Sequence, residues 1–95
     1  SAETRSLLQD LKRRVDALGG IFDVPQLERE LEELDQLASD PNFWNDQAKA
    51  QTQLRKRAEV QGKLTLVGGL EREVNDALEL TELGIAEGDE SVLAE

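Results

Sequence analysis

The sequence predicts an all-α fold, a three-helix antiparallel hairpin or small bundle with coiled-coil-like packing and one long helix over about residues 46–86. Leucine, valine and alanine recur every three or four residues through most of the 95-residue chain, which is the spacing of an apolar stripe on a helix. No stretch shows the period-two alternation of a strand. Each predicted helix has one apolar stripe, so each needs the others for stability. A chain of this length forms at most a single domain with a modest core.

The first predicted helix covers residues 3–18. Its apolar residues have helical spacing, and they are Leu7, Leu8, Leu11, Val15 and Leu18. Gly19 and Gly20 follow directly, and glycine is the usual residue just after the C-terminus of a helix. We therefore expect the first helix to end there, with Ile21 and Phe22 as a short apolar link.

The second predicted helix covers residues 24–38. Asp23 is a good N-cap, Pro25 lies in the first turn, and Gln26 stands where a capping box has Glu or Gln. Leu27, Leu31, Leu34 and Ala38 follow at heptad spacing. The helix should stop before Pro41, because the residue preceding a proline avoids the helical conformation.

A corner rich in aromatic residues follows the second helix and contains the single tryptophan of the chain. Asp40 can cap a turn that opens with Pro41, where a missing N–H costs nothing. Asn45 or Asp46 can then cap the next helix. Phe43 and Trp44 are adjacent and point in different directions, so the corner is better explained by aromatic packing than by a ligand site. We expect Trp44 to be largely buried between the second and third helices.

The third predicted helix runs over about residues 46–86, with apolar residues continuing through Val60, Val67 and Val74. Gly68 and Gly69 conflict with this prediction, since two glycines inside a helix cost about 1–2 kcal/mol relative to two alanines. The apolar register continues across them, and no capping residue comes after them. One uninterrupted helix is therefore favoured over a break at the glycines.

The composition argues against catalysis and against bound cofactors. The chain has no cysteine and no histidine, which removes thiol and imidazole chemistry and most transition-metal sites. Its many carboxylates lie in Glu-rich runs, where a solvated helix surface is a better explanation than a general acid, which needs a pocket to raise its pKa. No phosphate loop or calcium loop is present. We expect no catalytic residue, no metal, no cofactor and no small-molecule substrate.

The net charge of −10 is unevenly distributed. Residues 46–64 hold five basic and two acidic side chains, and Lys49, Lys56 and Lys63 recur every seven residues as a stripe. This stripe is the candidate RNA contact, although charge balance against the acidic second helix is the favoured explanation, because isolated surface charges rarely bind RNA without neighbours. Residues 65–95 hold nine acidic side chains and one arginine. The acidic end of this stretch would be repelled by RNA and suits a basic protein partner. Its candidate docking residues are Glu82, Glu87 and Glu90.

The corner sequence Asp40-Pro41-Asn42-Phe43-Trp44-Asn45-Asp46-Gln47, followed by Ala50-Gln51, resembles the N-terminal domain of the bacterial peptide chain release factor 2 family. In that family a similar corner joins a short helix to a long one. The Leu/Glu pattern of residues 27–34 and the acidic stretch near residues 78–90 also resemble the family. The resemblance covers about residues 18–93. It implies that the chain is a piece of a longer factor, whose first domain it represents.

The resemblance implies a cytoplasmic role in translation termination at UGA and UAA, without a membrane. The Gly-Gly-Gln loop on which peptide release depends in the family is absent, because Ile21 and Leu70 come after the two Gly-Gly pairs. The Ser-Pro-Phe stop-codon tripeptide is also absent. The remaining role is that of a non-catalytic docking and positioning domain. Its implied partners are the stalk base of the large ribosomal subunit, with its ribosomal RNA, and the GTPase release factor 3.

A second hypothesis is a free-standing acidic coiled-coil adaptor or scaffold protein that pairs or oligomerises through its leucine stripes. The two hypotheses differ in the sequence that they require beyond residue 95. A release factor continues there into an α/β region with Ser-Pro-Phe and Gly-Gly-Gln, whereas an adaptor need not.

Overall fold

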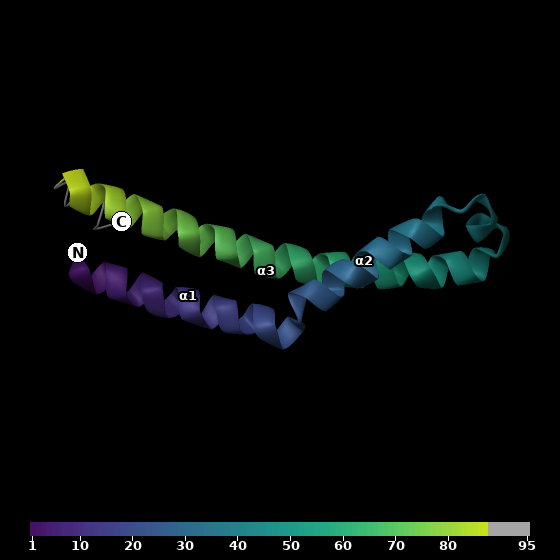
Figure 1. The fold of residues 1–95 in the computed structure, drawn as a ribbon, viewed down its shortest axis with the longest axis horizontal. Coiled ribbons are helices and arrows are strands. Elements are labelled where there is room, and N and C mark those ends of the chain that lie inside the picture. Colours follow the sequence, from purple (N-terminus) through teal and green to yellow (C-terminus); the bar gives the residue numbers. More distant parts are fainter. Residues whose placement is uncertain (88–95) are drawn as a thin grey trace. The chain divides into compact units, whose positions relative to one another are not determined.

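The structure, a computed structural model, describes residues 1–87 and consists there of helices only (Figure 1). Helix α1 covers Ala2–Phe22, α2 covers Val24–Ser39, the short 3₁₀ helix η1 covers Pro41–Asn45, and α3 covers Gln47–Glu87. The predicted all-α class with one long third helix is confirmed. None of the helices within residues 1–87 is long and apolar enough to cross a membrane.

The chain divides into two compact units, and α3 runs through both without interruption. The first unit combines Ser1–Gly19 with the chain from Val67 onward, and the second consists of Gly20–Leu66. In the first unit, α1 lies antiparallel to the second half of α3. The Arg5 Nε donates to Glu82 at 2.5 Å, and the Lys12 Nζ donates to Asn75 at 3.1 Å.

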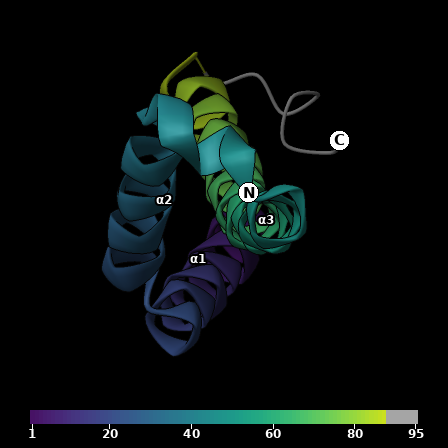
Figure 2. The ribbon, with the colours of Figure 1, turned by 90° about the vertical axis from the view of Figure 1, so that its right-hand side faces the viewer.

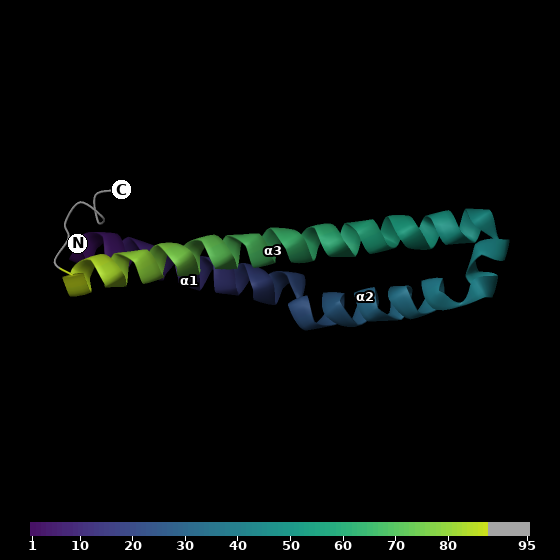
Figure 3. The same ribbon diagram turned by 90° about the horizontal axis from the view of Figure 1, so that it is seen from above.

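In the second unit, α2 lies antiparallel to the first half of α3, and η1 joins them at one end (Figure 3). The end-on view in Figure 2 shows η1 and the adjoining turns as the link between the two helices. Leu27 and Leu34 of α2 are buried, as are Ala50 and Val60 of α3. The Arg57 Nε donates to Asp35 at 2.5 Å across this pair.

The buried residues of α3 have the spacing of a coiled coil. Val60, Val67, Val74 and Thr81 are all buried and lie seven residues apart. Half-buried residues before and between them complete a pattern of alternating three- and four-residue steps, namely Arg57, Leu64, Glu71 and Leu78. This is the seam of a two-helix coiled coil, with charged residues at some seam positions. The predicted coiled-coil-like packing is therefore confirmed.

The prediction that α1 ends at Gly19-Gly20 is wrong, because the helix continues to Phe22. Gly19 is buried within the first unit, so it occupies a seam position instead of a C-cap. The break comes at Asp23, which has a left-handed φ of 53°. Asp23 nevertheless caps α2 as predicted, since its side chain accepts from the Gln26 N–H at 3.3 Å. The Gln26 side chain does not complete a capping box and instead accepts from Arg29 at 2.8 Å.

The helix prediction across Gly68 and Gly69 is confirmed, since both lie inside α3. A Cβ atom added at either glycine would meet nothing within 4 Å, apart from chain neighbours and the backbone of its own helix. Close approach of another segment is therefore not what requires glycine there. The predicted apolar stripe of α1 is confirmed only in part, because Leu7 is 72% exposed and Leu11 is 45% exposed.

Candidate functional site

The corner between α2 and α3 contains two capped helix starts in a row, those of η1 and α3. The Asp40 carboxylate accepts from the Asn42 N–H at 2.9 Å and so caps η1. The Asp46 carboxylate accepts from the Lys49 N–H at 3.1 Å, at the start of α3. Both aspartates therefore serve the backbone, as the sequence predicted for Asp40 and allowed for Asp46.

The two aromatic rings of this corner form an edge-to-face pair, with centroids 4.9 Å apart and an interplanar angle of 83°. Phe43 is half-buried, whereas Trp44 is 53% exposed. The prediction that Trp44 is largely buried is wrong. Phe43 takes the inner position at the end of the α2–α3 pair, and the adjacent Trp44 is left on the outside beside the first turns of α3.

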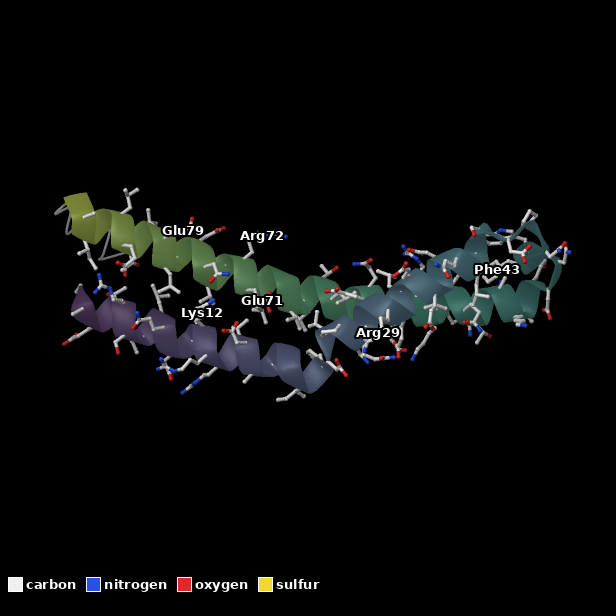
Figure 4. All side chains as sticks on the ribbon, viewed as in Figure 1. Lys12, Arg29, Phe43, Glu71, Arg72 and Glu79 are labelled. Atoms are coloured by element: carbon white, nitrogen blue, oxygen red, sulfur yellow. The ribbon has the colours of Figure 1, made fainter. Side chains whose placement is uncertain are left out.

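An open cavity of about 410 Å³ lies at this corner. Phe43 and Leu37 contribute its apolar lining, and Figure 4 shows Phe43 at this end of the pair. The polar lining residues are Asp40, Asn42, Asn45, Asp46, Lys49 and Gln53. Because the Asp40 and Asp46 carboxylates already bind backbone N–H groups, the cavity resembles a packing defect at a helix corner more than a catalytic pocket.

The predicted lysine stripe is exposed along the first half of α3. Lys49, Lys56 and Lys63 are all exposed, and within residues 1–87 none of their ammonium groups forms an ion pair. The cross-helix ion pair of this unit uses Arg57 and Asp35 instead. The sequence also allowed the basic residues of this stretch to balance the acidic charge of α2. In the structure Arg57 does so by pairing with Asp35, whereas the three lysines face solvent.

The Asp35–Arg57 ion pair joins α2 to α3 and shifts the pKa of both side chains. The hydrogen bond from Arg57 holds the pKa of Asp35 below its ordinary value, and the attraction between the two charges acts in the same direction. The same contact raises the pKa of Arg57. Both side chains remain partly exposed, so this pair fixes the pairing of α2 with α3 more than it supplies chemistry.

The candidate docking residues at the acidic end of α3 differ in their surroundings. The Glu82 carboxylate is bound by Arg5 through two hydrogen bonds of 2.5 and 2.9 Å. Glu79 is exposed and points away from α1 (Figure 4). Glu87 is the last residue of α3, and Glu90 lies outside the described residues.

Sequence reasoning missed the roles of Arg5 and Lys12, which join α1 to α3. Their positions carried a usable signal, because Arg5, Lys12 and Gly19 are seven residues apart and alternate with Leu8 and Val15 in steps of three and four. A basic residue at such a seam position reaches sideways to a polar group of the neighbouring helix. No group of three or more His, Cys, Asp or Glu residues within residues 1–87 is placed to hold a metal ion.

The fold and these surfaces define a helical coiled-coil protein whose exposed features are a lysine stripe, an aromatic corner and an acidic helix end. Its sequence is similar to peptide chain release factor 2 from several bacteria. It is 42% identical over 82 residues to the protein of Phenylobacterium zucineum. The aligned region covers 86% of this chain and 22% of the relative. It is 37% identical over 92 residues to the protein of Paramagnetospirillum magneticum. That aligned region covers 97% of this chain and 25% of the relative.

A third relative, release factor 2 of Burkholderia cenocepacia, is 38% identical over 88 residues, which is 93% of this chain and 24% of the relative. The resemblance to the N-terminal domain of release factor 2 is thereby confirmed, and the chain is related to this family of translation termination factors over nearly its whole length. The chain spans about a quarter of the length of these curated relatives. No family model matches it, and no solved structure matches it.

Proposed function

We propose that this chain is the N-terminal docking and positioning domain of a longer translation termination factor that directs release at UGA and UAA codons. Its role in the cytoplasm is non-catalytic. The observation that carries this proposal is the similarity to release factor 2 over most of the chain, in a sequence without histidine, cysteine or a Gly-Gly-Gln loop. A domain without reactive groups contributes through binding and orientation.

The acidic end of α3 is the surface we propose for a basic protein partner, either the GTPase release factor 3 or a protein of the ribosomal stalk base. Glu79 is exposed, and Glu82 is held by Arg5. Reversing Glu82 would therefore break a contact inside the domain as well as change the surface. Variants that leave Glu82 in place separate these two effects.

The test of this surface is the longer factor carrying Glu79→Lys, Glu87→Lys and Glu90→Lys. Single-round peptide release should be nearly unchanged, while GTPase-stimulated recycling should fall several-fold at low salt and recover as salt screens the charges. The matched control is Glu28→Lys, Glu32→Lys and Glu33→Lys, which makes the same change of charge at exposed positions of α2. Equal recycling by both variants and the unmodified factor, or a matching defect in release, would contradict the proposal.

The lysine stripe is the surface we propose for ribosomal RNA at the stalk base. Its support is that Lys49, Lys56 and Lys63 are exposed on a regular edge of α3, about 10 Å apart as seven helical residues are. Replacing all three with glutamine should weaken ribosome binding and reduce the slope of log affinity against log salt by about 0.7–0.9 for each phosphate that a lysine had neutralised. The control replaces Arg13, Arg14 and Arg72, which are also exposed. An unchanged slope for the lysine variant would rule out the RNA contact.

A further inference from the structure

Two helices, α1 and α3, each run from one compact unit of the chain into the other. In α1 the boundary between the units falls within the Gly19-Gly20 pair. In α3 it falls just before Val67, next to the Gly68-Gly69 pair. Four of the seven glycines of the chain therefore stand where a helix passes from one unit into the other.

The two glycine pairs also lie at the same level of the helix pair in the first unit. The hydrogen bond from Lys12 to Asn75 sets the antiparallel register of α1 against α3, and the contact one heptad away has the same register. Seven residues further along α1 is Gly19, and seven residues back along α3 is Gly68, so these glycines are level with each other. Two packed helices bend together most readily when both yield at one level.

Local packing does not require glycine at Gly20, Gly68 or Gly69. A Cβ atom added at any of the three would meet nothing within 4 Å beyond chain neighbours and the backbone of its own helix, and none of the three has a positive φ. Neither pair ends its helix. Glycine weakens a helix relative to alanine, and glycine pairs are among the few features at which helices kink. What these glycines supply is therefore ease of bending.

The polar contacts between helices lie on either side of the glycine pairs and not beside them. In the first unit the nearest is that of Lys12 with Asn75, and in the second it is that of Arg57 with Asp35. Between these two contacts, none of the described residues forms a hydrogen bond or ion pair that joins one helix to another. The seam next to Gly68 is apolar, with Val67 1% exposed, and apolar contacts are non-directional. A bend at this level therefore breaks no polar contact.

We propose that the Gly19-Gly20 and Gly68-Gly69 pairs form a hinge, at which α1 and α3 bend together and change the orientation of one unit against the other. Hinges of this kind consist of a few residues that absorb the backbone change. The lysine stripe belongs to the second unit and Glu79 to the first, so the bend would move the proposed RNA surface relative to the proposed protein surface. That consequence rests on the proposed function, whereas the hinge itself rests on the glycines.

The experiment is measurement of backbone N–H residual dipolar couplings for the 95-residue chain in a dilute alignment medium, with residues 47–66 and 70–86 of α3 fitted separately. A rigid straight helix gives both segments the same axis and the same degree of order. A fixed bend gives different axes with the same degree of order. A hinge gives different degrees of order, because one segment moves against the other, and this is the expected result.

Alanine variants assign the motion to the glycines. Gly20→Ala, Gly68→Ala and Gly69→Ala together should make the two degrees of order equal, with circular dichroism confirming that the chain stays helical. The control is Gly62→Ala, inside the second unit and equally open around the added Cβ, which should leave the difference unchanged. Equal degrees of order in the unmodified chain would overturn the hinge, as would a difference that survives the triple variant or disappears in Gly62→Ala. Each of these outcomes would leave the proposed role in termination untouched.

Discussion

At the scale of single residues, the corner shows how two adjacent aromatic side chains take different roles. Phe43 is half-buried and lines the cavity with Leu37, while Trp44 remains 53% exposed. Sequence alone placed both rings at the corner, because their neighbours Asp40 and Pro41 are helix-start residues. It assigned the buried position to Trp44, which is wrong, because the two residues are adjacent and either ring could fill the end of the helix pair.

This assignment predicts an order of stability losses. Trp44→Ala should cost about 1–2 kcal/mol of the free energy of unfolding, less than the roughly 3–5 kcal/mol of a fully buried tryptophan. Phe43→Ala should cost more than Trp44→Ala. Both values come from urea unfolding followed by circular dichroism, because tryptophan fluorescence is lost in one variant. A larger loss for Trp44 would show that its ring is the one that holds the corner.

The Asp35–Arg57 pair predicts a pH dependence with a definite sign. Its hydrogen bond lowers the pKa of Asp35 in the folded protein from the ordinary 3.8, so the stabilisation is present above that value and is lost as the pH falls through the lowered pKa. Asp35→Asn should therefore be slightly less stable than the unmodified chain near neutral pH and should approach it in acid. Glu32→Gln, an exposed change on the same helix, is the control. A stability difference for Asp35→Asn that does not shrink in acid would contradict this role.

At the scale of helices, α3 shows what periodicity can and cannot predict. Continuous apolar spacing predicted a single helix across Gly68 and Gly69, and α3 is continuous there. The rule that a glycine pair marks the end of a helix failed at Gly19 and Gly20, because α1 continues to Phe22. A glycine signal is local, whereas burial of Gly19 depends on the neighbouring helix. The stop lies instead at Asp23, whose left-handed backbone cannot be read from its residue type alone.

Gly68→Ala and Gly69→Ala should together stabilise the chain by about 1–2 kcal/mol, because alanine is the better helix former and an added Cβ has open space at both positions. The measurement is thermal or urea unfolding of the double variant. Gly62→Ala, at an exposed position of α3 that also has open space around the added Cβ, is the control and should stabilise by about half as much. A lower melting temperature for the double variant would indicate that the helix bends or opens at the glycine pair.

At the scale of the whole molecule, basic and acidic side chains concentrate in different halves of α3. Its first half carries the lysine stripe, and residues 67–87 carry six acidic side chains. The sequence predicted this division and the exposure of the lysines. It did not predict that Glu82 is held by Arg5, because that contact joins residues 77 positions apart and depends on the register of α1 against α3.

The central claim is that this chain contributes position and contacts to translation termination, and no chemistry. Its most direct test is release of formyl-methionine from ribosomes programmed with a UGA codon, with residues 1–95 added alone and the longer factor as the positive control. We predict that the chain alone releases no more than buffer does, even in large excess, while the longer factor releases fully. Release by the chain alone above the buffer level would contradict the claim.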